Sequence, residues 1–440
     1  MKPTSSILPV KWTWTLCILA GIYAVAVAAY LFTETPKPSS ASDFHAYWYA
    51  GHFLIEGRDP YQAYINGEQP SLPVRYRDRG ITRQYPIAQP GLSLAPAYTP
   101  VILIPLSLFS HLSWQTAKWS FLVLNLALLF ITGWLVLRRV PFGGIRLALL
   151  DELLIFLLYF DLSATRIAIE NGQVTLLVFA LMLITLLTAE FAWPVAGLAL
   201  GFALSKYSLA LPMVLFMIYK KKYRIIFLAV LIQLLGILGL AAITRQSPVS
   251  IVLENIQLFL QHFDQPGIQI SRWFESLLPN RFASLLPALV MTVLVFLPLF
   301  LWLRKRDQRT VPQGEIVDFH LLTILFIWTL LLGYHRLYDT LILVFFIVLV
   351  FKGSASPGIW GLAARERTAL WTFMLLLPPI LILPARIVDL LLPFYYGRVS
   401  DFITTILLVI MLAISMFLLW RYLQNMQLKI NHKEAESHEL

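Results

Sequence analysis

The chain carries little charge and almost no cysteine. Only 13% of its 440 residues are Asp, Glu, Lys or Arg, against roughly 25% in a soluble domain. The single cysteine, Cys17, lies inside the first apolar run, so one chain can form neither a disulfide framework nor a thiolate metal site. The formal net charge of +10 does not indicate a nucleic-acid partner, because Lys and Arg gather at the ends of apolar runs.

Apolar runs of about 20 residues, the length that crosses a bilayer, recur from end to end. None of them alternates with period two, which excludes a transmembrane barrel. We predict an all-α polytopic membrane protein with one transmembrane domain over residues 1–423 and a loose, polar cytoplasmic tail over 424–440. The run Trp12–Phe32 is followed by no A-x-A-like cleavage site, so we expect a retained first helix and not a cleaved signal.

The basic clusters predict the topology. Because Lys2 and Lys11 precede the first run, the N-terminus is expected in the cytoplasm. Residues 33–113 then form a first external loop with short interfacial helices, and residues 245–282 form a second external segment. Prolines interrupt residues 92–112, which we interpret as an interfacial or shallow helix, with a spanning helix as the alternative. The total is about 11–12 transmembrane helices.

Residues 193–219 decide how the later helices are oriented. If they cross once, the basic cluster that begins at Lys220 lies outside. If they form a hairpin with its tip near Lys206, the cluster lies inside, as the positive-inside rule expects. We predict the hairpin. Lys206 then lies in the outer half of the membrane, where a lysine should face protein or a wet cavity.

The first external loop opens with a carboxylate among aromatic residues. We expect a short helix over Phe44–Glu56, interfacial in position, with Gly57 after its end. Asp43 at its start is an N-cap or a catalytic base, and the two roles are compatible. His45 and His52 share one helical face, but no third ligand accompanies them, so no metal site and no cofactor are predicted.

Further polar residues are expected at the same external rim. Lys206 is either a snorkelling lysine or a phosphate contact. His335 is either a turn residue or a phosphate ligand that could also position a base, and Arg386 is an anchor or a second phosphate ligand. Gln173 opens a helix and could otherwise bind a sugar. The midplane is nearly free of charge and no internal repeat is visible, so an ion-coupled transporter is not supported.

Several short motifs follow one another in a recognisable order. They are Asp43-Phe44-x-x-Tyr47-Trp48-x-Ala50, Gly57-x-x-Pro60-Tyr61, Tyr85-Pro86, Gly172-Gln173, Ala196-Gly197-x-x-x-Gly201-x-x-x-x-Lys206 and Tyr334-His335. With them the sequence resembles the GT-C superfamily of glycosyltransferases, in particular family 87, the polyprenol-phosphate-mannose type. The resemblance covers roughly the first half in order and one late landmark. Ile87 and Tyr207 depart from it, since proline is common at both places.

The resemblance implies a GT-C fold and transfer of a sugar, a mannose-like hexose or a pentose, from a polyprenyl-phosphate donor to a lipid or glycan acceptor. Transfer would invert the anomeric carbon on the extracytoplasmic face of the plasma membrane, with Asp43 as general base. The residue types fit this chemistry, since the departing phosphate needs cations, and Lys206, His335 and Arg386 supply them.

Aromatic side chains complete the expected site. Tyr47, Trp48 and Tyr85 could stack on sugar rings, and Gln173 could hydrogen-bond a sugar hydroxyl. Two other functions remain open. The chain could be a transporter or flippase of lipid-linked sugars that forms no bond, or a non-catalytic assembly subunit that keeps the fold.

Overall fold

The computed structural model is helical throughout the residues it describes, and no strand occurs among them. The described residues are 10–36, 41–68, 98–140, 147–263, 268, 270, 286–305, 314–333, 335–370, 372–373 and 398–438. The helices are α1 (Val10–Glu34), α2 (Ser42–Ile55), α3 (Pro60–Ile65), α6 (Pro100–Leu106), η1 (Ser107–His111), α7 (Trp114–Arg138), α8 (Leu149–Asp161), α9 (Ser163–Glu170), α10 (Thr175–Thr188), α11 (Trp193–Ala203), η2 (Leu204–Lys206), α12 (Tyr207–Tyr219), α13 (Tyr223–Thr244), α14 (Pro248–Phe263), α17 (Leu286–Lys305), α18 (Glu315–Leu332), η3 (Leu337–Leu343), α19 (Val344–Ala355), α20 (Pro357–Trp360) and α23 (Arg398–His438).

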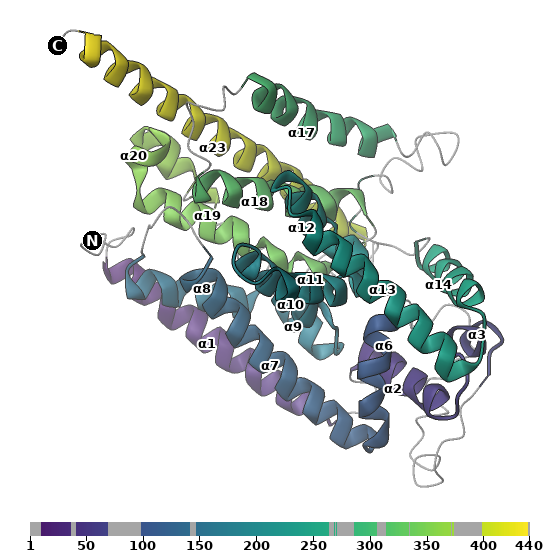
Figure 1. Cartoon of the computed structure of the whole chain (residues 1–440). Coiled ribbons are helices and arrows are strands. Elements are labelled where there is room, and N and C mark those ends of the chain that lie inside the picture. Colours follow the sequence, from purple (N-terminus) through teal and green to yellow (C-terminus); the bar gives the residue numbers. More distant parts are fainter. Residues whose placement is uncertain are drawn as a thin grey trace. The chain divides into compact units, whose positions relative to one another are not determined.

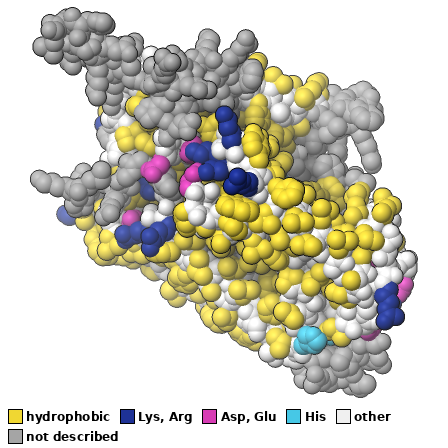
Figure 2. Space-filling view, viewed as in Figure 1, with side chains coloured by type: hydrophobic (Ala, Val, Ile, Leu, Met, Phe, Trp, Pro, Cys, Tyr) yellow, Lys and Arg dark blue, Asp and Glu magenta, His cyan; other side chains and the backbone are white. Residues whose placement is uncertain are grey.

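Seven helical segments in the described part are long and apolar enough to cross a membrane, or eight if the bent pair α9 and α10 counts as one. Large apolar side chains are exposed along them, among them Val25 on α1 and Phe227 on α13. Figure 2 shows hydrophobic side chains over much of the visible face, as contact with lipid requires. The all-α polytopic fold is therefore confirmed. The total of 11–12 stays a prediction, because residues 374–397 and other segments lie outside the described residues.

The contacts divide the chain into two compact units. The α2 unit contains residues 25–135 and 165–265, and the α18 unit contains residues 1–24, 136–164 and 266–440. Within the α18 unit, α18 packs against α19 and α23, and its residues from Ile316 to Leu331 are almost all buried. Within the α2 unit, α2 packs against α3, α6 and η1 (Figure 1).

Helix α2 lies inside the protein and not on its surface. All residues from Phe44 to Leu54 are buried, and the Phe44 ring stacks on Phe121 with 4.1 Å between centroids. The interfacial position of this helix stays a prediction, because burial among other side chains does not fix its depth in the membrane. The aromatic residues that suit a membrane interface also suit a helix enclosed by other aromatic rings, and sequence alone does not separate the two.

The turn between α9 and α10 covers the first turn of α2. The Glu170 carbonyl accepts from Ala41 N–H at 3.0 Å, and the Asn171 carbonyl accepts from Asp43 and Phe44 N–H at 3.0 and 3.2 Å. These amides would otherwise lack partners at a helix start. The residue before the helix is Ala41, with φ 56 and no side-chain cap. Asp43 is thus not the N-cap, since backbone carbonyls of the turn do what a capping side chain would do.

Helices α11, η2 and α12 follow without a gap, and by length and composition Trp193–Tyr219 counts as one span. Their packing shows a reversal. Gly197 lies against Leu228 and Gly201 against Ile232, so α11 and α13 run in the same direction, and α12 between them must run back. The chain reverses at Lys206, whose φ of −116 and ψ of 71 are not helical. This arrangement agrees with the predicted hairpin.

Three other boundaries differ from the predictions or refine them. The polar stretch 161–173 contains helix α9, in which Arg166 and Glu170 form an (i, i+4) ion pair at 3.8 Å. Helix α6 is only seven residues long, too short for the roughly 30 Å of a bilayer core, so residues 100–111 favour the shallow interpretation. Helix α23 continues to His438. The tail expected to be loose is helical because it is rich in Gln, Leu, Lys and Glu.

Gly172 provides the first test of this packing. Its φ is +66, and a Cβ added there would lie 2.5 Å from the Cβ of Phe44. We predict that Gly172→Ala lowers the free energy of unfolding by about 2 kcal/mol or more, through backbone strain and overpacking. Unfolding of the purified protein in detergent measures this effect.

Gly21→Ala is the matched control. Gly21 has no atom within 4 Å of an added Cβ and lies in a helix, where alanine is favoured. This variant should be as stable as the wild type or slightly more stable. If Gly172→Ala were equally harmless, the turn would not be held against α2 as described.

Candidate functional site

Asp43 and Gln173, 130 positions apart, are in contact. The Gln173 side-chain N–H donates to the Asp43 carboxylate. Asp43 lies in the first turn of α2, where the helix dipole favours a negative charge. A donated hydrogen bond and a helix start both stabilise the ionised carboxylate, which is the form that can accept a proton.

Tyr98 holds the other end of the same amide. Its hydroxyl donates to Gln173 Oε1 at 2.9 Å, and its ring packs edge-on against Tyr47 with 5.1 Å between centroids. Gln173 is 2% exposed, and both ends of its amide are occupied. The geometry therefore gives Gln173 a role in holding Asp43, while the predicted sugar contact stays a prediction.

Lys206 reaches the same helix start as Asp43. Its ammonium donates to the Thr175 hydroxyl at 2.8 Å, and Thr175 is the first residue of α10, two positions after Gln173. The tip of the α11–α12 hairpin and the start of α2 therefore meet at residues 173–175. Two of the predicted site residues, one carboxylate and one cation, are brought together there.

The contacts of two further predicted residues can be described, each within its own unit. Trp48 is fully buried, and its indole N–H donates to the Leu112 carbonyl at 3.2 Å, so it packs the core and its stacking on a sugar stays a prediction. His335 belongs to the α18 unit, where it is buried and its Nδ1 lies 3.1 Å from Asp339 Oδ2. Tyr85 and Arg386 lie outside the described residues.

The two histidines of α2 are neutral. Burial lowers the pKa of His45 to about 3 and that of His52 to about 4. Neither can therefore supply a positive charge near neutral pH. No group of three or more His, Cys, Asp or Glu side chains in the described ranges could hold a metal ion.

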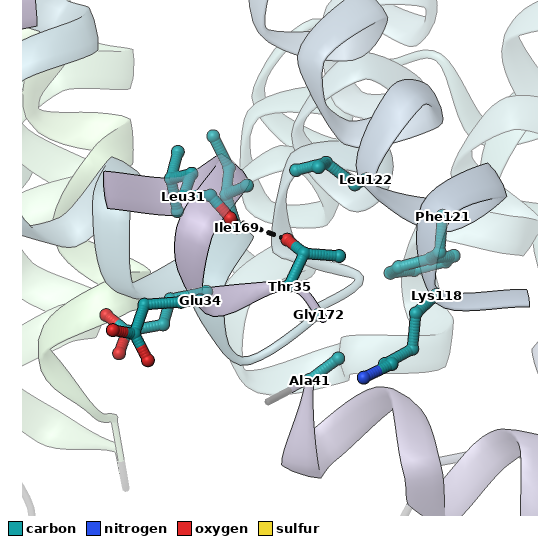
Figure 3. A pocket seen from close by; sticks show the side chains of 10 residues that line it. Leu31, Glu34, Thr35, Ala41, Lys118, Phe121, Leu122, Ile169 and Gly172 are labelled. Carbon is teal, nitrogen blue, oxygen red and sulfur yellow. Dashed lines mark hydrogen bonds between the residues drawn. The ribbon is translucent and has the colours of Figure 1, made fainter. Parts of the chain in front are cut away.

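A small pocket lies beside the turn that docks on α2 (Figure 3). Ala41 and Gly172 form part of its wall, and Leu31 and Ile169 give it apolar surface. The side chain of Lys118 extends from α7 towards Ala41. The pocket thus joins a cation and apolar side chains beside the start of α2.

A pair of acids links α3 to α14 in the same unit. Asp59 Oδ1 caps α3 by accepting from Tyr61 N–H at 2.7 Å and from Gln62 N–H at 3.4 Å. Burial and the adjacent Asp59 raise the pKa of Glu254 to about 7, and burial also raises the pKa of Asp59. The two carboxyl groups therefore share a proton at moderately acid pH. Sequence reasoning missed this pair, because its members are 195 positions apart.

Tyr98 and Thr175 were also missed. Tyr98 follows a proline-interrupted stretch with no periodic pattern, and Thr175 looks like any apolar-helix threonine. A signal exists only for Thr175, since Gly172-Gln173 marks a helix start. The contacts of Tyr98 depend on the tertiary fold.

A family model described as glycosyltransferase family 87 matches residues 97–333, more than half of the chain. This range includes Tyr98, Gln173, Thr175 and Lys206, and Asp43 lies before it. No curated protein and no solved structure matches the chain.

The acid pair predicts a pH dependence of stability. Because the folded-state pKa of Glu254 is raised to about 7 from 4.5, its stabilising effect is complete below pH 4.5 and is lost as the pH rises through about 7. We predict that Glu254→Gln removes this loss, because a glutamine amide donates to Asp59 at every pH. Thermal unfolding between pH 4.5 and 8.5 measures it.

Glu190→Gln is the control for that series. Glu190 is a more exposed carboxylate whose partner is Lys222, at 2.5 Å. Its substitution should leave the pH dependence above pH 5 as in the wild type. An unchanged slope in Glu254→Gln would show that the pair shares no proton.

Proposed function

The chain belongs to glycosyltransferase family 87, and we propose that it transfers a sugar from a polyprenyl-phosphate donor to a hydroxyl of a lipid or glycan acceptor. The membrane-spanning helices and the family make it a membrane glycosyltransferase. The donor class, the inverting stereochemistry and the residue roles below are the proposal.

One observation carries these roles. Asp43 and Lys206 approach the same helix start, through Gln173 and Thr175. A base for the acceptor and a cation for the departing phosphate are the two groups that this reaction needs close together. Neither position alone would support the proposal, because a carboxylate at a helix start and a lysine at a hairpin tip are each common.

In the proposed reaction the acceptor oxygen attacks the anomeric carbon from the face opposite the phosphate. The bond between that carbon and the phosphate oxygen breaks, and the electron pair leaves with the polyprenyl phosphate. Asp43 takes the proton of the acceptor hydroxyl as the new bond forms. Since a phosphate is a good leaving group, no strong general acid is required.

Lys206 stabilises the charge that grows on the departing phosphate. Its ammonium acts as a point charge and a donor of up to three hydrogen bonds. Thr175 accepts one of these, and in this proposal the phosphate oxygens of the donor accept another. The roles of His335 and Arg386 as phosphate ligands, and of Tyr47 and Tyr85 as sugar contacts, stay predictions from the sequence.

The reaction takes place on the extracytoplasmic face of the plasma membrane in this proposal. The basic clusters of the short loops support this orientation, since they belong to the cytoplasmic side. The turn at 170–173 and the hairpin tip at Lys206 then lie at the opposite side.

Asp43→Asn tests the base. We predict that it reduces turnover at least about 100-fold, because an amide cannot take the acceptor proton and general base catalysis contributes 10²–10⁴-fold. The measurement is transfer of radiolabelled sugar from polyprenyl-phosphate mannose to extracted membrane lipids. Glu170→Gln is the control, since this carboxylate on the same turn is bonded to Tyr30 and should be dispensable. Full turnover in Asp43→Asn would exclude Asp43 as the base.

Lys206→Met tests the phosphate contact. Loss of a charge-assisted hydrogen bond should weaken donor binding about 10-fold or more, visible as a raised KM for the donor. Lys206→Arg should retain part of the affinity. Lys222→Met, which removes a lysine paired with Glu190, is the control and should leave KM unchanged. An equal KM together with an equal kcat in Lys206→Met and the wild type would remove Lys206 from the donor site.

A flippase that forms no bond is separated from this function by product analysis. Mass spectrometry of the lipids after incubation should find an acceptor heavier by one sugar residue. Movement of the donor across the membrane with no new glycoside would contradict the proposal.

A further inference from the structure

Hydrogen bonds from two helices hold the backbone of Tyr98. Its backbone carbonyl accepts from the Tyr61 hydroxyl on α3 at 2.5 Å and from Asn255 Nδ2 on α14 at 3.2 Å. The neighbours of these two donors, Asp59 and Glu254, form the acid pair that joins α3 to α14. The position of Tyr98 is therefore set from both sides by groups that do not depend on its own hydroxyl.

The hydroxyl of Tyr98 selects one orientation of the Gln173 amide. A carboxylate is an acceptor only, so the amide nitrogen must face Asp43 for a hydrogen bond to form. In the reversed orientation Oε1 would face the carboxylate, and two acceptors would repel each other. By donating to Oε1 at 2.9 Å, Tyr98 stabilises the orientation in which Gln173 donates to Asp43.

We propose that Tyr98 is a positioning residue that acts through Gln173 to hold the Asp43 carboxylate ionised and in one place. This inference rests on the proposed role of Asp43 as the base. In this proposal the contribution of the Tyr98 hydroxyl passes through the amide of Gln173.

The alternative is that Tyr98 only fills space against Tyr47. The two possibilities differ in what the hydroxyl does. Tyr98→Phe keeps the ring and the backbone carbonyl with both of its donors, and it removes only the O–H that orients Gln173. A packing role predicts no change in the titration of Asp43, whereas the positioning role predicts that protonation of Asp43 becomes easier.

The test follows the carboxyl band of Asp43 by infrared difference spectroscopy of the purified full-length protein across pH 3 to 8. The band is identified by its absence in Asp43→Asn, so no substrate is needed. We expect the titration midpoint to move up by about one pH unit in Gln173→Met and by about half a unit in Tyr98→Phe, since a hydrogen bond to a charged group has that order of strength.

A double variant tests whether Tyr98 acts on Asp43 through Gln173. In the Gln173→Met background, Tyr98→Phe should add no further shift, because the amide through which it acts is absent. Tyr30→Phe is the matched control, since it removes a hydroxyl that donates to Glu170 on the same turn at 2.7 Å and should leave the midpoint unchanged. An unmoved midpoint in Tyr98→Phe, or the same shift in both backgrounds, would overturn the inference.

This readout is independent of catalysis. If Asp43→Asn keeps full turnover, the proposed function of Asp43 fails, whatever the infrared midpoints are. If Asp43→Asn is inactive and Tyr98→Phe leaves the midpoint unchanged, only the role of Tyr98 fails.

Discussion

The rest of the site depends on the docking of the 170–173 turn on the first turn of α2. Backbone carbonyls of this turn satisfy the amides of Ala41, Asp43 and Phe44, and Gly172 permits the close approach. Because these backbone carbonyls cap the helix, the Asp43 carboxylate is not its N-cap. It can instead accept from Gln173, which follows the turn directly.

The same contact brings distant parts of the chain to one place. The turn leads into α10, whose first residue, Thr175, meets Lys206 at the tip of the α11–α12 hairpin. A carboxylate and an ammonium are thus both bonded to residues at the start of α10, Asp43 to Gln173 and Lys206 to Thr175. The proposed transfer from a lipid phosphate needs these two kinds of group in one site, a base for the acceptor hydroxyl and a cation for the departing phosphate.

The sequence predicts the parts of this fold that local physics decides. The first apolar run places α1 to within two residues at each end, Gly57 follows the end of α2 with φ 71 as expected, and the charge rule indicates the reversal at Lys206. It does not predict the left-handed Ala41, because that conformation is imposed by the α9–α10 turn and alanine carries no signal for it. The sequence also does not predict the contacts of Tyr98 or the Asp59–Glu254 pair, because only the packing of α14 on α3 brings these residues together. The burial of α2 is missed because aromatic residues fit an interface and a core equally well.

The central claim is that Asp43 and Lys206 act in one active site, Asp43 on the acceptor hydroxyl and Lys206 on the phosphate of the donor. A cryo-EM structure of the protein with a non-transferable polyprenyl-phosphate sugar analogue tests it most directly. The account predicts a phosphate oxygen within hydrogen-bond distance of Lys206 Nζ, with the sugar between that phosphate and the Asp43 carboxylate. A phosphate bound elsewhere, with Lys206 still bonded only to Thr175 and no space beside Asp43 for a sugar, would contradict it.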